Sequence, residues 1–250
     1  MTRIVSFLNF KGGTGKTTTV VNLGMGLAMR GYRVLAMDLD AQGSVAGWLG
    51  ARYEQTLAEL LLGKAAWFDC VTRARTRLDI IAADRRLTEA EQKLIMQQEQ
   101  PDVLRRRLAG IEGAGYDFIL LDCPPSMNLL SECALHFSQE VCIPVSMEYL
   151  AVVSARLVVL EIVRTRRLSP GHPVRLVLVI PTFYDRRYAK SREIIEMLQR
   201  HFPGIVAEPI RASARLSEAP SHHLTIFEYD PTGPGSTDYA RLVERIIGHA

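Results

Sequence analysis

The sequence lacks several features that would each indicate a particular class of protein. No run of 18 or more apolar residues occurs in its 250 residues, so we expect no membrane-spanning helix. The first residues lead straight into a strand-like run without a basic leader, an apolar core and a cleavage site, so we expect no export. No internal repeat or low-complexity tract is present.

Cysteine is scarce and scattered. The four residues, Cys70, Cys123, Cys133 and Cys142, form no CxxC pair, and their spacing fits neither a zinc site nor a disulfide framework. We interpret them as small core residues of a reduced, cytoplasmic protein.

The composition is typical of a soluble globular protein, with 48% hydrophobic and 23% charged residues. A chain of this length can bury one α/β core but is too short for two ordinary domains and a linker. We therefore expect residues 1–250 to form a single domain. The Pro- and Gly-rich residues 231–235 are predicted to form a surface turn before the last helix.

Charge is distributed unevenly along the chain. Residues 156–215 contain twelve Lys and Arg against five Asp and Glu, in a chain whose net charge is only +3. Such a basic C-terminal half suits a polyanionic partner, although a solvated surface gives the same count.

Short β-rich runs alternate with longer helical stretches. Strands are expected at residues 4–9, 33–38, 78–82, 117–121, 141–145, 174–180 and 205–207, and helices at 16–30, 86–98, 101–109, 150–167, 190–201 and 237–247. This alternation predicts an α/β fold, a doubly wound and mostly parallel sheet flanked by helices.

A glycine-rich loop separates the first expected strand from the first helix. Its glycines allow close backbone approach, and the helix N-terminus that follows favours an anion. Lys16 is placed to reach the β- and γ-phosphates of ATP, and the Thr17 hydroxyl to bind Mg²⁺. The predicted nucleotide-binding positions of this loop are Lys11, Gly12, Gly13, Thr14, Gly15, Lys16, Thr17 and Thr18.

The loop departs from the pattern G-x-x-x-x-G-K-[ST] at its first glycine, where Phe10 stands. A second lysine, Lys11, follows directly. Two lysines are more than one triphosphate needs, so we interpret Lys11 as reaching a second nucleotide that is bound by another subunit.

Two acidic motifs follow later strands. Asp38 and Asp40 come straight after a buried strand, at the edge where parallel sheets bind ligands, and Asp40 is a candidate to orient water or hold Mg²⁺. Asp122 ends the apolar run of residues 118–121, as a Walker B aspartate that holds Mg²⁺ does. Pro124 and Pro125 then fix an extended loop suited to sensing the γ-phosphate.

These motifs together resemble one family. The KGGTGKT loop is similar to the deviant Walker A motif of the ParA/MinD (SIMIBI-type) P-loop ATPases. The resemblance implies that Lys11 crosses the interface of an ATP-sandwich homodimer and that Lys16 is the ordinary P-loop lysine. It also assigns hydrolysis to Asp40 through the DxDxQG motif, and the DxPP form at Asp122 matches the same family.

Blocks near residues 143–145, 183–187, 215–222 and 228–231 resemble the ParA/Soj partition branch. In that branch the dimer binds DNA without sequence preference, and Arg187 and Arg215 match arginines implicated in that binding. Phosphate contacts of this kind give salt-sensitive affinity. Arg211 is a further expected nucleotide contact. Residues expected to widen the DNA-binding patch are Arg186, Lys190, Arg192, Arg164, Arg166 and Arg167.

The leading hypothesis is therefore a ParA-like, nucleoid-associated ATPase that positions a cargo and is stimulated by a ParB-like or adaptor protein. One alternative is a MinD/FlhG-like membrane ATPase, although the C-terminal apolar stripe of Tyr239, Leu242, Val243, Ile246 and Ile247 is short. An iron–sulfur ATPase would need surface cysteines that bridge two subunits. A small-molecule kinase or synthetase is the remaining alternative.

Overall fold

The computed structural model describes residues 2–248 and contains one seven-stranded sheet with the order β3-β4-β2-β5-β1-β6-β7. All neighbouring strands are parallel except the β3–β4 pair. The strands are β1 (Arg3–Phe7), β2 (Val34–Asp38), β3 (Val71–Arg75), β4 (Leu78–Ile81), β5 (Phe118–Asp122), β6 (Glu140–Ser146) and β7 (Arg175–Thr182).

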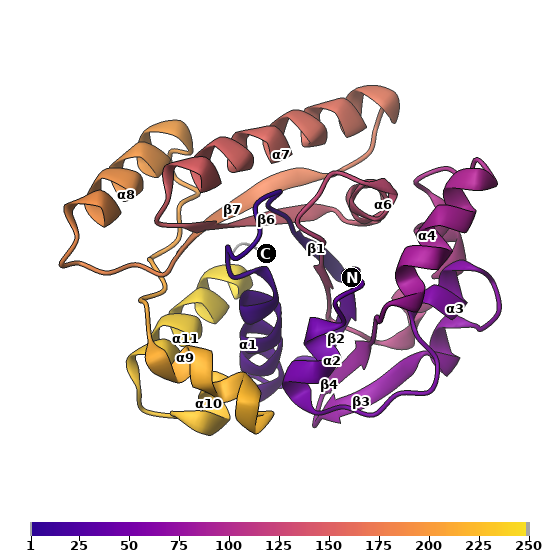
Figure 1. The fold of residues 1–250 in the computed structure, drawn as a ribbon, viewed down its shortest axis with the longest axis horizontal. Coiled ribbons are helices and arrows are strands. Elements are labelled where there is room, and N and C mark those ends of the chain that lie inside the picture. Colours follow the sequence, from indigo (N-terminus) through magenta and orange to yellow (C-terminus); the bar gives the residue numbers. More distant parts are fainter. Residues whose placement is uncertain (1, 249–250) are drawn as a thin grey trace.

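Helices connect the strands and cover both faces of the sheet (Figure 1). They are α1 (Lys16–Met29), α2 (Ser44–Leu49), α3 (Leu57–Leu61), α4 (Arg86–Met96), α5 (Val103–Arg107), α6 (Leu129–Phe137), α7 (Tyr149–Leu168), α8 (Ala189–His201), α9 (Ala214–Glu218), α10 (Ile226–Tyr229) and α11 (Pro234–Ile247). Short 3-10 helices are η1 (Trp67–Asp69), η2 (Ile111–Ala114) and η3 (Ala219–His222). No helix within residues 2–248 is long and apolar enough to cross a membrane.

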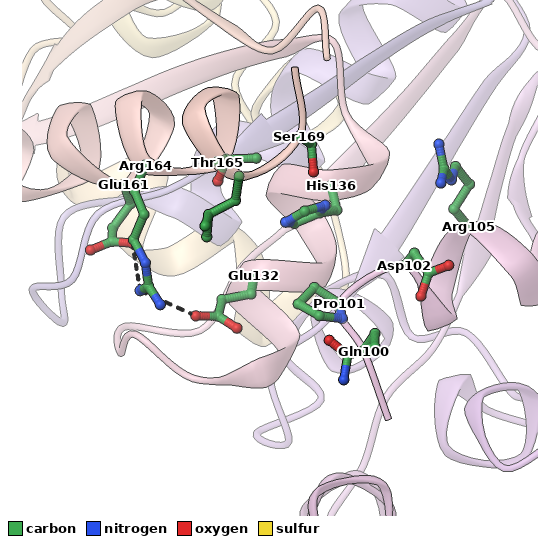
Figure 2. Close-up of a pocket in the computed structure, with 11 residues that line it drawn as sticks. Gln100, Pro101, Asp102, Arg105, Glu132, His136, Glu161, Arg164, Thr165 and Ser169 are labelled. Carbon is green, nitrogen blue, oxygen red and sulfur yellow. Dashed lines mark hydrogen bonds and ion pairs between the residues drawn. The ribbon is translucent and has the colours of Figure 1, made fainter. Parts of the chain in front are cut away.

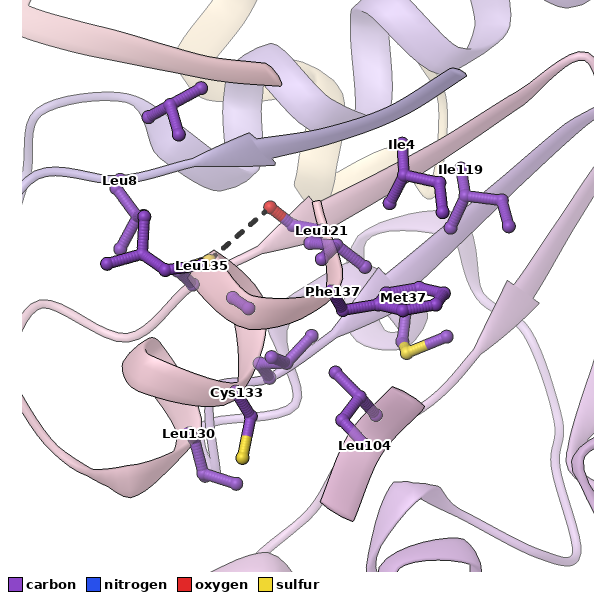
Figure 3. Packing of buried hydrophobic residues seen from close by; sticks show 14 of the residues in the cluster. Ile4, Leu8, Met37, Leu104, Ile119, Leu121, Leu130, Cys133, Leu135 and Phe137 are labelled. Atoms are coloured by element: carbon purple, nitrogen blue, oxygen red, sulfur yellow. Dashed lines mark hydrogen bonds between the residues drawn. The ribbon is translucent and has the colours of Figure 1, made fainter. Parts of the chain in front are cut away.

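Two hydrophobic clusters lie on opposite faces of the sheet. Side chains alternate along a strand, so in β5 Ile119 and Leu121 join one cluster while Phe118 and Leu120 join the other. The first cluster packs under α3 to α8, and Figure 3 shows strand residues meeting α6 there. The second packs under α1, α2, α10 and α11. Because the central strands are buried on both faces, they are continuous apolar runs, as parallel strands usually are.

The central strands end together at one edge of the sheet. In the parallel register, Asp122 at the end of β5 pairs with Phe7 of β1 on one side and with Asp38 of β2 on the other. This edge, which we call the phosphate edge, therefore collects the glycine-rich loop and both acidic motifs, and the opposite edge carries the amino ends of the same strands.

The predicted fold class is confirmed, and six of the seven expected strands occur with bounds shifted by at most three residues. The expected strand at residues 205–207 is wrong, because only a single bridge between Val179 and Val206 forms there. The antiparallel β3 was not expected. The C-terminal stripe packs inside the protein, since Tyr239, Leu242, Val243 and Ile246 are all buried.

Candidate nucleotide-binding site

The glycine-rich loop forms an open cradle at the start of α1. Gly13 and Gly15 have positive φ angles of 72° and 84°, which glycine adopts without strain. Apart from the adjoining residues of the loop, no atom of residues 2–248 lies within 4 Å of a Cβ placed on Gly12 or Gly13, so the backbone there faces free space. A ligand with phosphate oxygens can therefore approach the N–H groups and the helix N-terminus directly.

The two lysines of the loop have different surroundings. Lys16 is buried, and its Nζ donates to the carbonyl oxygens of Asn9 (3.1 Å) and Lys11 (3.2 Å). Burial lowers the pKa of Lys16, although nearby Asp122 opposes that shift. Lys11 is more exposed, and its ammonium forms an ion pair with the Glu148 carboxylate, which holds the pKa of Glu148 below its usual value. Lys16 is thus held inside the cradle by two backbone carbonyl groups, whereas the Lys11 ammonium is held outside it by Glu148.

Asp122 has one oxygen that is committed and one that is not. The Thr17 hydroxyl donates to Asp122 Oδ2 at 2.6 Å. Within residues 2–248, the buried Oδ1 has no hydrogen-bond partner. Burial raises the pKa of Asp122 to about 7, and Asp40 adds to that rise while Thr17 and Lys16 oppose it. A buried carboxylate oxygen without a partner is a position that a cation fills favourably.

Both aspartates hold the loop after β2: Asp40 Oδ1 accepts from Gln42 N (3.0 Å) within the loop, and Asp38 joins the loop to α2. Asp38 Oδ1 accepts from Asp40 N (2.9 Å), and Asp38 Oδ2 accepts from Val45 N (3.0 Å) at the start of α2. Asp38 is fully buried, and burial raises its pKa well above the usual value, with Asp122 adding to the rise. Asp40 is partly exposed and lies close enough to influence Lys16 and Asp122. The structure therefore brings Lys16, Thr17, Asp40 and Asp122 together.

The oxygen donors at this edge fit Mg²⁺. No group of three or more His, Cys, Asp or Glu side chains that could hold a metal occurs in the described part of the chain. Mg²⁺, however, is usually held by one or two protein oxygens together with phosphates and waters. The Thr17 hydroxyl and Asp122 Oδ1 match that requirement, so Mg²⁺ fits here only together with a phosphate ligand.

An apolar cavity of about 230 Å³, which we call the base pocket, adjoins the cradle. Sequence patterns did not reveal it, because its walls come from distant segments. Its lining residues are Gly15, Thr18, Trp48, Thr182, Phe183, Ile210, Arg211, Ser213, Leu216, Ser217, Pro220 and Tyr239. Its apolar walls and its position beside the phosphate cradle suit a nucleobase.

Two residues of the base pocket have special constraints. Phe183 has a positive φ of 55°, an uncommon value for an aromatic residue that is typical of functional sites. The expected contact Arg211 lines the pocket, but its guanidinium donates to both oxygens of the buried Asp238, with the shortest distance at 2.7 Å. The Arg211 side chain is therefore held in place by Asp238 and forms part of the pocket wall as half of an ion pair.

The candidate DNA-binding residues divide into two groups. Arg186, Arg187, Lys190 and Arg215 are exposed and follow β7 at the phosphate edge. Arg187 is paired with Asp185 (2.6 Å) and Arg215 with Glu218 (3.0 Å), so neither guanidinium is free of a local carboxylate.

Arg164, Arg166 and Arg167, which were expected to widen this patch, lie apart from it. They lie in the last turns of α7, which runs back from the phosphate edge to the opposite edge. A helix of 20 residues spans about 30 Å, so these three residues are not continuous with the patch at the phosphate edge, and their part in DNA binding stays a prediction. Arg192, on α8, stays near Lys190.

A larger cavity of about 540 Å³ lies at the opposite edge, between α5, α6 and α7 (Figure 2). Arg164 there binds Glu132 (3.5 Å) and Glu161 (3.3 Å). Burial and the neighbouring His172 lower the pKa of His136. The walls thus have both signs of charge, mostly paired, and no glycine-rich loop.

All four cysteines are buried. Burial raises the pKa of the thiol groups of Cys70, to about 11, and of Cys133, to about 12. They therefore remain protonated at neutral pH and offer no surface ligand to an iron–sulfur cluster.

Comparison with known proteins identifies the family. Residues 2–168 match the family described as AAA domain. The sporulation initiation inhibitor protein Soj of Bacillus subtilis is 36% identical over 100% of both chains. The chromosome-partitioning ATPase Soj of Treponema pallidum is 34% identical and covers 99% of this chain and 98% of its own.

A solved structure agrees in fold. The Mycobacterium smegmatis protein described as cobyrinic acid a,c-diamide synthase, with a bound ATP analogue and magnesium, is 27% identical. The match covers 100% of this chain and 96% of that one, with a TM-score of 0.85. The phosphate cradle and the two acidic motifs agree with the full-length match to Soj proteins. The chain belongs to the ParA/MinD family of P-loop ATPases, in the partition branch.

Proposed function

We propose that this chain is a ParA-like positioning ATPase whose 250 residues act as one ATPase domain. Its cofactors are ATP and Mg²⁺, bound at the phosphate edge. The observation that carries the proposal is the pairing of an open backbone cradle at Gly12 and Gly13 with the unpartnered Oδ1 of Asp122 beside Thr17. The first suits phosphate oxygens and the second suits the cation that accompanies them.

Each side chain of the site has a distinct role in ATP hydrolysis. Lys16 exchanges its two carbonyl acceptors for the β- and γ-phosphate oxygens. Thr17 and Asp122 hold Mg²⁺, which neutralises phosphate charge when bound. Asp40 orients the attacking water, and the bonds from Asp38 to the backbone of Asp40 and Val45 fix the loop that carries it.

A second copy of the chain supports turnover through Lys11. In the monomer the Lys11 ammonium rests on Glu148, immediately before α7. The same surface exposes Tyr149, Leu150 and Phe183, which are 59%, 66% and 48% accessible. Exposed apolar groups beside a cationic side chain are typical of an interface. An ATP-bound homodimer would cover them and place Lys11 on the partner's phosphates.

The exposed cations at the phosphate edge support binding to DNA without sequence preference. Arg186, Arg187, Lys190 and Arg215 are exposed side chains suited to phosphate contacts. The dimer would present two such sets to the nucleoid. A ParB-like or adaptor protein would then accelerate slow hydrolysis and release the monomers, which positions the cargo.

The mass of the protein with ATP tests this proposal. Asp40→Ala slows hydrolysis, so light scattering with Mg²⁺ and ATP should give a dimer. Lys11→Ala in the same background should stay monomeric, while Lys93→Ala, an exposed lysine on α4, should dimerise normally. A monomeric Asp40→Ala protein, or a dimer that tolerates Lys11→Ala, would contradict the proposal.

A second candidate is a cobyrinic acid amidating synthase, which the name of the Mycobacterium smegmatis structure suggests. Phosphate release distinguishes the two. A synthase would release phosphate faster when cobyrinic acid and glutamine are added, whereas a partition ATPase would respond to DNA and its partner protein. Acceleration by cobyrinic acid and glutamine alone would favour the synthase.

A further inference from the structure

The short helix α2 lies between the catalytic loop and the segment that carries Arg215. α2 begins at Ser44, directly after the loop of residues 38–43. Asp38 accepts hydrogen bonds from the N–H groups of Asp40, within that loop, and of Val45, in the first turn of α2. A Cβ on Gly43 would lie 2.5 Å from the carbonyl oxygen of Ala83, so the loop is closely packed. The Asp38 side chain therefore links the position of Asp40 to that of α2.

α2 is bonded directly to residues 223 and 224, far away in sequence. Trp48 Nε1 donates to the carbonyl oxygen of Leu224 at 2.8 Å, and His223 Nδ1 donates to that of Gly47 at 3.0 Å. Arg75 joins the same two segments, donating to the carbonyl oxygens of Leu49 (3.2 Å) and His223 (2.6 Å). Figure 1 shows α2 near α10, on the side of the molecule where β2, β4 and β3 lie.

The contact with His223 is closely fitted. His223 has a positive φ of 56°, and a Cβ on Gly50 would lie 2.9 Å from the imidazole Cγ. Position 50 therefore requires glycine, and the imidazole ring packs against the end of α2. Trp48 is 8% exposed and also lines the base pocket, so it contacts both the site and residue 224.

The segment before His223 is held mainly by surface contacts. Tyr229 Oη donates to Glu218 (2.9 Å), the His222 and Tyr229 rings stack, and the partly buried Leu216 packs against the second cluster. α9 buries none of its residues, and in η3 only Ala219 is buried. Arg215 on α9 is exposed, bonded to Glu218 and positioned over the Tyr229 ring. Segments with few buried contacts shift at low free-energy cost. The bonds from α2 therefore add to a small set of surface contacts that determine where this segment lies.

We propose that α2 and residues 219–225 move as one unit, so that Trp48 and His223 position the Arg215 segment according to the nucleotide at the phosphate edge. Contact of the γ-phosphate and its water with Asp40 would shift the loop that carries Asp40. α2 follows this loop and would shift with it. Through the bonds of Trp48 and His223, α9 would then change the position of the Arg215 side chain on the surface. The consequence for DNA rests on the proposed function, but the coupled motion itself does not.

Variants at His223 separate this coupling from folding. His223→Gly accepts the left-handed backbone but loses the imidazole donor. His223→Asn also tolerates that backbone and keeps an N–H group near Gly47, so it is the matched control. Trp48→Phe keeps an aromatic ring in the pocket wall but loses the indole donor. Each protein is studied at saturating nucleotide, so that a change in ATP affinity does not alter the measured response.

Hydrogen–deuterium exchange with Mg²⁺ and a non-hydrolysable ATP analogue measures the response. In the native protein and in His223→Asn, exchange at residues 214–225 should change about fivefold, a coupling at the low end of the usual range. In His223→Gly and Trp48→Phe that response should be lost while residues 11–17 still respond. A native segment that does not respond, or a response that survives in either donor-loss variant, overturns the proposal.

DNA affinity gives the functional measurement. The ratio of affinities with the ATP analogue and with ADP should fall about fivefold in His223→Gly and remain native in His223→Asn. If the native protein binds no DNA in either state, the DNA part of the proposed function fails. The exchange experiment still decides the coupling in that case, so the two failures are distinguishable.

Discussion

The two edges of the sheet differ in whether their charged side chains are buried and whether they are paired. At the phosphate edge, Lys16 and Asp122 are buried, and Asp122 Oδ1 has no partner within the described residues. At the opposite edge, Arg164 and Glu132 are more exposed and already bound to each other. The larger cavity lies at the opposite edge. The functional edge is therefore identified by its buried ionisable groups, one of which has an oxygen without a partner, and not by the size of its cavity.

The largest expected difference between the edges is in ATP binding. Lys16→Ala removes the buried cation, so affinity for ATP should fall about 100-fold or more, as for the loss of a charge-assisted contact in a closed site. Arg164→Ala at the opposite edge should leave the affinity unchanged. Calorimetric titration with ATP and Mg²⁺ compares the two, and native affinity in Lys16→Ala would remove the loop from its assigned role.

The second-largest difference between the edges is expected in the rate of ATP hydrolysis. Asp40→Ala should bind ATP and dimerise but release phosphate about 100-fold more slowly, the usual effect of losing a group that orients the attacking water. Asp102→Ala, which removes a carboxylate from the larger cavity, is the control and should hydrolyse at the native rate. Rapid turnover by Asp40→Ala, measured as phosphate released with time, would exclude that role.

The pH dependence of stability should sharpen the comparison. Burial raises the pKa of Asp122 to about 7, so without metal the folded protein keeps a proton that the unfolded chain releases near pH 4. The free energy of unfolding should therefore fall as pH rises from about 4 to about 7, by up to about 1.4 kcal/mol per unit for one proton. Asp38, whose pKa is also raised, contributes in the same direction.

Asp122→Asn tests this origin. Denaturant unfolding with a chelator present should show a clearly smaller decline with pH in this variant, because the Asp122 proton no longer contributes and only groups such as Asp38 and Glu91, whose pKa values burial also raises, remain. Addition of Mg²⁺ and nucleotide to the native protein should also flatten the decline, since the metal replaces the proton. An equally steep decline in Asp122→Asn would show that the dependence arises elsewhere.

DNA affinity should show a smaller effect. Arg215→Ala should weaken binding about three- to tenfold and reduce the slope of log affinity against log salt by about 0.9, the value for one phosphate contact. Arg167→Ala, at the far end of α7, should change neither quantity. Fluorescence anisotropy with a labelled duplex at several salt concentrations measures both. Equal effects of the two variants would contradict the separation of the basic residues into two groups.

The smallest effect is expected at the opposite edge itself. Arg164→Ala should change the free energy of unfolding by less than about 0.5 kcal/mol, because its side chain is 56% exposed and solvent screens its ion pairs. Thermal unfolding at two salt concentrations checks this. A loss of several kcal/mol would mean that the larger cavity is an organised charged site after all.

The central strands and the phosphate loop were predictable because their signals are local. The apolar run ending at Asp122, and the glycines next to Lys16, specify their own conformation. β3 was missed because VTRAR is a polar sequence, and only the neighbouring β4 makes it a strand. The expected strand at residues 205–207 lies between Pro203-Gly204 and Pro209, and Pro209 has no N–H to continue a ladder.

The rest of the site depends on contacts that no local pattern contains. Trp48 and Leu224 are 176 residues apart in sequence and meet only in the folded chain. Arg164, Arg166 and Arg167 were grouped with Arg187 on a count of charges along the sequence, and such a count does not contain the direction of α7, which runs back to the opposite edge. In contrast, the pairing of Arg187 with Asp185 is local, two residues apart, and could have been anticipated.

Both lateral margins of the sheet are closed to strand addition. β3 is short, its register shifts between Arg73 and Arg75, and the Arg73 side chain is 82% exposed. On the other side, residues 205–210 run along β7, with hydrogen bonds to Val179 and Pro181. Such margins resist pairing with another chain. Association of copies of this protein, as in the proposed dimer, is therefore expected to use side-chain surfaces and not to extend the sheet into a fibre.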